Sequence, residues 1–181
     1  ITINITNLND NSPEITSSST FSAAENQTSV GTVTATDADG DSLTFALSGT
    51  DASSFSIGSS SGVITFNNAP DYETKTSYSI IVSVSDGINN VTQSITVNVT
   101  DGNDNSPEIT SSSTFSAEEN QTDVGTVTAT DADGDSLTYS LSGTDASSLS
   151  IGSSSGVITF NSAPDYETKT SYSITVSVSD G

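Results

Sequence analysis

The sequence predicts an all-β protein built from two tandem sandwich repeats, and three observations support this prediction. Only 31% of the 181 residues are hydrophobic, and the abundant Ser, Thr, Asp, Asn and Gly favour strands and turns over helices. Short runs alternate between hydrophobic and polar residues, as half-buried strands do. The third observation is a long internal repeat.

The repeat covers most of the chain. Residues 12–87 align with residues 106–181, which gives a period of 94 residues. The seven differences are Ala24/Glu118, Ser29/Asp123, Phe45/Tyr139, Ala46/Ser140, Phe55/Leu149, Asn68/Ser162 and Ile81/Thr175. A repeat of this length is typical of a sandwich domain that folds by itself, whereas shorter repeats need neighbours to complete a core.

About seven short strands are predicted in each repeat, and each is bounded by Gly, Asn, Asp or Ser. In repeat 1 they are "STFSA" at 19–23, "GTVTAT" at 31–36, "LTFAL" at 43–47, "FSI" at 55–57, "GVITFN" at 62–67, "YSIIVSV" at 78–84 and "SITVNV" at 94–99. One hydrophobic face on each strand supports a sandwich with a single core. A disordered Ser/Thr-rich linker would not keep this alternation.

The chain ends predict three segments. Residues 1–11, "ITINITNLNDN", match residues 95–105, "ITVNVTDGNDN". We therefore expect the last strand and linker of a preceding repeat at 1–11, repeat 1 with its linker at 12–105, and repeat 2 without its last strand at 106–181. Residues 1–6 either extend freely or fill the vacant sheet edge of repeat 2 in a neighbouring molecule, which would build a head-to-tail filament. An arbitrary crop of a longer chain would produce the same boundaries.

The charge of the chain excludes several classes of partner. There are 23 acidic residues against two lysines, and the formal net charge is −21. Such a chain cannot neutralise phosphates, so nucleic acid and anionic membranes are poor partners. With no His and no Cys, the usual zinc ligands are missing, and the remaining oxygen ligands suit calcium or magnesium. No apolar stretch is long enough to insert into a membrane.

We predict that the protein is not an enzyme. A nucleophilic serine would lack its usual histidine base. Paired carboxylates can serve a glycosidase, but the acidic phrases of this chain fit metal ligation better.

Five acidic phrases recur in a fixed order. In repeat 1 and the link that follows it they are "AEN" at 24–26, "DADGD" at 37–41, "DYE" at 71–73, "SDG" at 85–87 and "TDGNDNSPE" at 100–108. Two carboxylates about 4 Å apart at a protein surface repel by roughly 4 kcal/mol, so a cluster of them calls for a divalent cation. Calcium accepts irregular sets of six to eight oxygen ligands more readily than magnesium does. The alternative is that these residues are solvated turns that keep an acidic protein soluble.

In their order, the phrases resemble the cadherin repeat. The matching stretches are "ENQTSVGTVTATDADGDSLTFAL", "FSIGSSSGVITFNNAPDYET", "YSIIVSVSDG" and "TDGNDNSPE". The resemblance implies seven-strand Greek-key sandwiches in an elongated array, with calcium ions that stiffen each junction. It also implies an extracellular or cell-surface location, and we expect a large microbial surface or adhesin protein. The chain contains no Trp, so the Trp-anchored strand exchange of adhesive animal cadherins cannot operate.

The resemblance also implies which residues bind calcium. At the junction of the two repeats they are Glu25, Asp71, Glu73, Asp101, Asn103, Asp104, Asp131, Asp133 and Asp180, with a backbone carbonyl of Gly102 or Asn105. Half of a shell is implied at the first junction by Asn9, Asp10, Asn11, Asp37, Asp39 and Asp86, and at the distal end by Glu119, Asp165 and Glu167. The family commonly places an asparagine carbonyl after "DADGD", and Asp41 or Asp135 could replace it here.

Two classes of function remain open. In the first, the repeats are calcium-stiffened spacers or fibre segments of a cell-surface adhesion protein. In the second, the sandwich face itself binds a carbohydrate or another copy, which would require a platform of exposed aromatic rings. The candidates for such a platform are Tyr72, Tyr78, Tyr166 and Tyr172.

Overall fold

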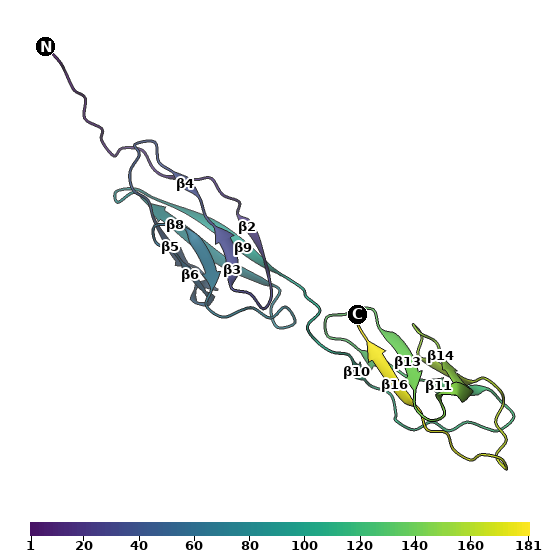
Figure 1. The fold of residues 1–181 in the computed structure, drawn as a ribbon. Coiled ribbons are helices and arrows are strands. Elements are labelled where there is room, and N and C mark those ends of the chain that lie inside the picture. The colour runs from purple at the N-terminus through teal and green to yellow at the C-terminus, as the bar shows by residue number, and fades with distance from the viewer. The chain divides into compact units, whose positions relative to one another are not determined.

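The computed structural model describes residues 1–181, which divide into two compact units, Ile1–Gly102 and Asn103–Gly181. Each unit consists of strands and one short 3-10 turn, η1 (Ala52–Ser54) or η2 (Ala146–Ser148) (Figure 1). The prediction of an all-β protein is confirmed. Residues 1–10 extend from unit 1 without forming a strand.

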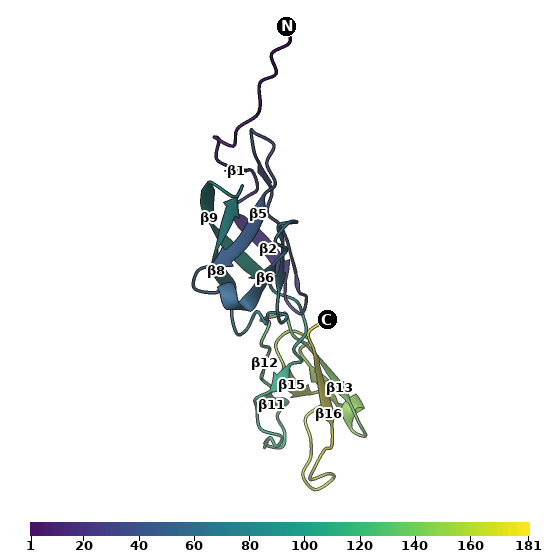
Figure 2. The same ribbon diagram turned by 90° about the vertical axis from the view of Figure 1, so that its left-hand side faces the viewer.

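Unit 1 contains two main sheets. The first has the order β2 (Thr20–Ala24), β9 (Asn90–Thr100), β8 (Ser77–Ser85), β5 (Thr44–Ser48) (Figure 2). The second has the order β3 (Ser29–Thr32), β7 (Val63–Phe66), β6 (Phe55–Ile57). A short pair of strands, β1 (Glu14–Ile15) and β4 (Ala35–Thr36), completes the unit. The seven predicted strands of repeat 1 are all present, with "GTVTAT" divided between β3 and β4.

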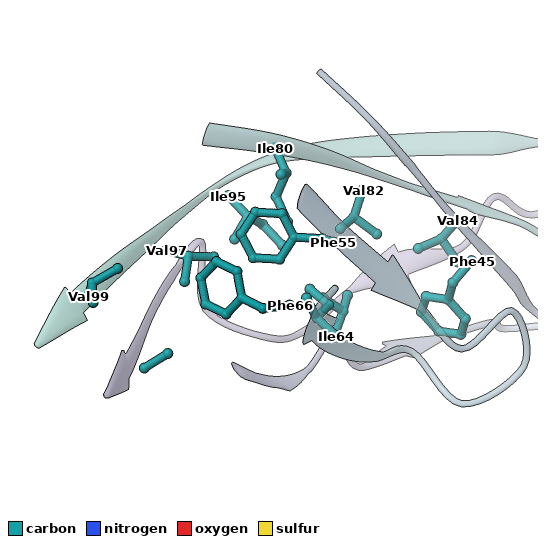
Figure 3. Close-up of a cluster of buried hydrophobic side chains, with 12 residues drawn as sticks. Phe45, Phe55, Ile64, Phe66, Ile80, Val82, Val84, Ile95, Val97 and Val99 are labelled. Carbon is teal, nitrogen blue, oxygen red and sulfur yellow. The ribbon is translucent and has the colours of Figure 1, made fainter. Parts of the chain in front are cut away.

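The core of unit 1 lies between these sheets and consists of the predicted alternating residues (Figure 3). Ile64, Ile80, Val82, Val84 and Val97 have no exposed surface. Burying a side chain of this size stabilises a fold by about 1.5–3 kcal/mol. The alternation in the sequence therefore identifies the face of each strand that holds unit 1 together.

In the four-stranded sheet of unit 1, β9 lies between β2 and β8. It pairs in parallel with β2 on one side, from Thr20 opposite Thr96 to Ala24 opposite Thr100. On the other side it pairs antiparallel with β8, from Ser77 opposite Asn98 to Ser85 opposite Asn90. In this sheet β2 therefore pairs with β9 alone, whereas β8 pairs with β9 on one side and with β5 on the other.

Unit 2 repeats this arrangement only in part. Its three-stranded sheet, β11 (Asp123–Thr126), β15 (Val157–Phe160), β14 (Leu149–Ile151), matches that of unit 1. The remaining strands form two pairs, β10 (Glu108–Ile109) with β12 (Ala129–Thr130) and β13 (Thr138–Ser142) with β16 (Thr175–Ser179).

The missing strands of unit 2 are those that β9 supports in unit 1. Residues 114–118 match β2 in sequence but form no strand, and β16 begins at Thr175 although the match to β8 begins at 171. Unit 2 has no counterpart of β9 between these two segments. The predicted "STFSA" strand therefore forms in repeat 1 and not in repeat 2, because a strand needs a hydrogen-bonding partner.

The difference in burial predicts unequal effects of the same core substitution. Ile80 is fully buried, whereas its equivalent Ile174 is only half-buried. We expect Ile80→Ala to lower the free energy of unfolding of unit 1 by about 2–5 kcal/mol, because truncating a fully buried side chain leaves a cavity. Ile174→Ala should lower the free energy of unfolding of unit 2 by less than half as much. Amide hydrogen exchange of the full chain measures both units separately. Equal losses in the two units would contradict the structure.

Candidate functional site

Each unit carries a cluster of three aspartates directly after β4 or β12, here called the aspartate triad. The triads are Asp37, Asp39 and Asp41 in unit 1, and Asp131, Asp133 and Asp135 in unit 2. In each triad one oxygen from every carboxylate lies within 4.8 Å of the others. The structure thus brings together the predicted "DAD" ligands and adds Asp41 and Asp135, which the sequence offered only as replacements.

Several triad oxygens are buried without a hydrogen-bond donor. They are Oδ2 of Asp37, Oδ2 of Asp41 and Oδ2 of Asp131. Burying an anionic oxygen without a partner carries a large free-energy penalty. A cation with oxygen ligands would remove this penalty, so the donor set of the triads fits calcium.

The middle aspartate of each triad accepts hydrogen bonds from the "NDN" phrase that precedes the sandwich of its unit. Asp39 Oδ2 accepts hydrogen bonds from the backbone N–H groups of Asp10 at 3.0 Å and Asn11 at 2.8 Å, and its Oδ1 accepts one from Asn11 Nδ2 at 2.8 Å. These bonds from Asn11 lower the pKa of Asp39. The predicted link ligands Asp10 and Asn11 therefore lie beside the triad of unit 1.

Unit 2 repeats this arrangement. Asp133 Oδ2 accepts hydrogen bonds from the N–H groups of Asp104 at 3.0 Å and Asn105 at 2.9 Å, and Asp133 Oδ1 accepts one from Asn105 Nδ2 at 2.7 Å. The Asp-Asn pair of the phrase "NDN" is thus bound in the same way in both units.

Asp41 lies in an unfavourable electrostatic environment. Burial raises its pKa, and repulsion by Asp37, Asp39 and Asp86 raises it further. The negative charge of Asp41 therefore opposes folding until a positive charge balances the triad.

Asp86 and Asn89 complete the end of unit 1 that contains the triad. Asp86 is buried and accepts hydrogen bonds from the N–H groups of Ile88 at 2.8 Å and Asn89 at 2.6 Å. Asn89 Nδ2 in turn donates to the backbone carbonyl of Asn11 at 3.0 Å and to Oδ1 of Asn9 at 3.2 Å. Asn89 is not among the residues predicted from the sequence, and its place three residues after Asp86 is the only signal that could have suggested it.

At the opposite end of unit 1, Glu25 joins two of the predicted acidic phrases to the link. Its side chain is only 5% exposed. Glu25 Oε2 accepts a hydrogen bond from the N–H of Tyr72 at 2.8 Å, and Oε1 accepts one from the N–H of Gly102 at 2.7 Å. The neighbouring Asn26 has a φ of 58°, a left-handed conformation that Asn tolerates better than most residues. This explains why "EN" appears as a pair.

Other predicted ligands at this end of unit 1 lie on the surface. Asp71 accepts a hydrogen bond from the hydroxyl of Thr74 at 2.8 Å, which lowers the pKa of Asp71. Glu73 and Asp101 are exposed. The equivalent end of unit 2 gathers Glu119, Asp165 and Glu167, whose facing oxygens lie within 4.8 Å of one another, and all three are exposed. Asp180 is half-buried, and its neighbour Gly181 lies beside Asn103.

Both lysines are engaged away from these clusters. Lys75 Nζ lies 2.5 Å from Asp51 Oδ1 and 4.4 Å from the centroid of the Tyr78 ring. Lys169 pairs with Asp145 and lies over Tyr172 in the same way. Because the chain has no other basic side chain, no lysine or arginine neutralises the acidic clusters.

The tyrosines do not form a shared exposed platform. Tyr78 contacts the Phe66 ring edge-on at 5.1 Å between centroids, and Tyr172 contacts the Phe160 ring at 4.9 Å. Tyr72 packs against the core of unit 1, whereas its equivalent Tyr166 is 62% exposed. These contacts favour a packing role for three of the four rings.

No helix has the length and apolar character needed to span a membrane.

Comparisons with known proteins identify the class of protein. The family profile of the cadherin domain matches residues 19–100 and 113–181. Cadherin-23 of Homo sapiens is 34% identical over 160 residues, which cover 84% of this chain and 5% of Cadherin-23. Protocadherin Fat 4 of Mus musculus is 31% identical over 140 residues, which cover 72% of this chain and 3% of that protein. This chain belongs to the cadherin domain family, and it spans only a small part of these relatives.

Solved structures confirm the fold. Mouse Cadherin-23 EC22-24 has a TM-score of 0.76 and 27% identity, with 96% of this chain and 61% of that chain covered. The human Desmocollin-1 ectodomain has a TM-score of 0.79 and 26% identity, with 95% of this chain and 38% of that chain covered. The relatives named here are mammalian, so the expectation of a microbial source stays a prediction.

Removing Glu25 tests its place as a connector within unit 1. In calcium-free buffer, Glu25→Ala should lower the stability of unit 1 by about 1–3 kcal/mol, because two backbone N–H groups lose their acceptor. Glu119→Ala is the matched control, since Glu119 is exposed and accepts one N–H bond, from Tyr166 at 3.2 Å. Chemical denaturation measures both. An equal effect of the two substitutions would contradict this role.

The Lys75–Asp51 pair predicts a pH dependence. The hydrogen bond from Lys75 lowers the pKa of Asp51 below its ordinary value of 3.8. A lowered carboxyl pKa contributes stability above the unfolded pKa and loses it as the pH falls through the folded pKa. Wild type should therefore be more stable than Asp51→Asn at neutral pH, and this difference should disappear in acid. The exposed Asp123→Asn serves as control, and a difference between wild type and Asp51→Asn that stays constant with pH would refute the assignment.

Proposed function

We propose that the chain is a calcium-stiffened segment of an extracellular, cell-surface adhesion protein, where it acts as a spacer or fibre segment. The observation that carries this proposal is the group of buried triad oxygens that lack a donor, Asp37 Oδ2, Asp41 Oδ2 and Asp131 Oδ2. Membership of the cadherin domain family supports the adhesion setting. The acidic phrases recur once per repeat, as a function at every junction requires.

The proposed shells combine residues at the ends of successive repeats. Between the two repeats, the ligands would be Glu25, Asp71, Glu73, Asp101, Asn103, Asp104, Asp131, Asp133 and Asp180, with the carbonyl of Gly102 or Asn105. Asn9, Asp10, Asn11, Asp37, Asp39 and Asp86 would bind calcium with a preceding repeat, and Glu119, Asp165 and Glu167 with a following one. The corresponding repeat boundaries are those predicted from the sequence, at 12–105 and 106–181.

A bound cation would restrict the conformations of the link as well as balance the negative charge of the carboxylates. Asp39 and Asp133 already hold the links by hydrogen bonds, and calcium would balance the carboxylates that repel one another there. The link would then have fewer conformations, which makes the array stiffer and longer. A ligand that binds only the folded state stabilises it by about 2.7 kcal/mol at one hundred times its Kd.

The remaining expectations follow from the same charge pattern. The partners would be neighbouring repeats of the same protein, and neither nucleic acid nor a membrane would bind a surface with a formal net charge of −21. The role is structural and involves no catalysis. A sandwich face that binds carbohydrate has less support, because three of the four tyrosines pack against the cores.

Thermal melting combined with small-angle X-ray scattering tests the proposal. Excess calcium should raise the melting temperature and lengthen the particle relative to a chelator, because it removes the repulsion and restricts the link. Asp131→Asn should reduce both responses to calcium. Asp123→Asn is the matched control, since Asp123 lies outside every acidic cluster and unit 1 has a serine at the equivalent position.

Two results would contradict the proposal. Calcium could leave both the melting temperature and the particle length unchanged, in which case the acidic phrases are solvated turns. Alternatively, Asp123→Asn could reduce the responses as much as Asp131→Asn does, in which case the cation acts through general charge screening and not through the triad.

A further inference from the structure

The side-chain amide of Asn89 lies among three oxygen atoms at the end of unit 1 that carries the aspartate triad. Its Nδ2 donates hydrogen bonds to Oδ2 of Asp86 at 3.0 Å, to the carbonyl of Asn11 at 3.0 Å and to Oδ1 of Asn9 at 3.2 Å. The three acceptors are a carboxylate, a backbone carbonyl and a side-chain amide oxygen. Calcium in proteins is bound by the same types of oxygen.

The amide fills this place incompletely. A side-chain amide carries only two N–H donors, so it cannot give each of the three oxygens a hydrogen atom of its own. It is also neutral, whereas Asp86 carries a negative charge that repels those of Asp39 and Asp41. Both lysines pair elsewhere, so no basic side chain supplies the missing positive charge. A divalent cation would match both the number and the charge of these oxygens better than the amide does.

The backbone of the turn fixes Asn89 in this place. The N–H of Asn89 donates to Oδ1 of Asp86 at 2.6 Å, and the N–H of Asp86 donates to the carbonyl of Asn89 at 3.3 Å. The hydroxyl of Ser85 donates to the same carbonyl at 2.9 Å. The position of the amide among the oxygens therefore follows from the fold of the turn between β8 and β9.

The amide of Asn89 also helps to order the link. Asp39 accepts hydrogen bonds from the N–H and from Nδ2 of Asn11, both at 2.8 Å. Asn89 binds the remaining polar group of the same backbone unit, the carbonyl of Asn11, and it reaches Asn9 two residues earlier. The amide thus contributes two of the hydrogen bonds that hold the link while no ion is bound.

The electrostatic effect of Asn89 on Asp86 has the same sign as that of a cation. Burial alone would raise the pKa of Asp86, but hydrogen bonds from the backbone and the side chain of Asn89, with weaker ones from Ile88 and Asn9, hold this pKa below its ordinary value of 3.8. A donor beside a carboxylate favours the charged form, as a nearby positive charge does.

We propose that the Asn89 amide is an internal substitute for a cation, which orders the link at residues 9–11 without calcium and is displaced when calcium binds there. The displacement rests on the proposed function, whereas the ordering of the link does not. Calcium lies about 2.3–2.6 Å from its ligands, so an ion that binds the three oxygens from the same side occupies the position of Nδ2. Amide and ion therefore exclude each other, and Asn89 lowers the apparent calcium affinity of this end of unit 1.

Hydrogen exchange of the full 181-residue chain in chelator tests the first half of the proposal. Asn89→Ala should speed exchange at the N–H groups of Asp10 and Asn11 by about three- to tenfold, because the link loses two hydrogen bonds. The substitution keeps the backbone hydrogen bonds of the turn, and Asn89 has no positive φ that alanine would resist.

Asn90→Ala is the matched control for this experiment. Asn90 is the next residue and is exposed, and its Oδ1 accepts a hydrogen bond from the hydroxyl of Ser83, away from the link. Its loss should leave exchange at Asp10 and Asn11 unchanged. Unchanged exchange in Asn89→Ala, or an equal increase in Asn90→Ala, would overturn the proposal.

Repeating the exchange in about 10 mM calcium, above the usual Kd of extracellular calcium modules, tests the displacement. The ion takes the place of the missing amide, so Asn89→Ala should exchange at Asn11 as slowly as wild type. If Asn89 only shapes the turn, the difference between Asn89→Ala and wild type persists in calcium, and that result would overturn the proposal. The melting temperature of wild type then shows which idea failed, because a rise with calcium preserves the proposed function and no rise removes it too.

A calcium titration followed by NMR at the Asn11 amide gives an independent check. Removing the competing amide should lower the apparent Kd at this end of unit 1 by about three- to tenfold in Asn89→Ala, the same factor as the lost hydrogen bonds. Asn90→Ala should titrate like wild type. An apparent Kd for Asn89→Ala that equals or exceeds that of wild type would show that the amide and the ion do not compete.

Discussion

One aspartate in each unit ties the link to the sandwich that follows it, and the candidate site depends on this contact. Asp39 and Asp133 each accept three hydrogen bonds from an "NDN" phrase, all between 2.7 and 3.0 Å. The same contact gathers carboxylates that no lysine can balance, since both lysines pair elsewhere. The geometry that orders the link therefore concentrates negative charge beside it, and this charge is the basis of the proposed calcium binding.

The sandwich depends on a second constraint, the central place of one late strand. In unit 1, β9 gives hydrogen bonds to β2 and β8 and covers the core between them. Unit 2 has nearly the same sequence over the matched residues, yet 114–118 and 171–174 are not strands. Residues 171–174 are identical to 77–80, and 114–118 differ from β2 only by Glu118 in place of Ala24, so the main difference is the missing partner strand. Contacts distant in sequence decide whether these segments become strands.

Much of the fold could be predicted because alternation reports which face of a strand is buried. Ile80, Val82 and Val84 alternate along the strand predicted at 78–84, and all three are fully buried. The candidate ligands follow from the order of the acidic phrases and from the family resemblance, and their binding of calcium stays a prediction. Asn89 was not predicted, because its role depends on a turn that brings it to Asn9 and Asn11. Nor could spacing alone show that the carboxylate of Asp41 lies near those of Asp37 and Asp39, since this depends on the path of the backbone between these residues.

The most direct test of the central claim is a crystal structure of the chain grown in calcium, with anomalous scattering used to locate the ions. The buried triad oxygens predict anomalous peaks about 2.3–2.6 Å from Asp37 Oδ2 and Asp131 Oδ2, the usual range for calcium and oxygen. Well-ordered triads without such peaks, in crystals that hold calcium elsewhere, would show that these carboxylates serve the link alone and would contradict the proposed function.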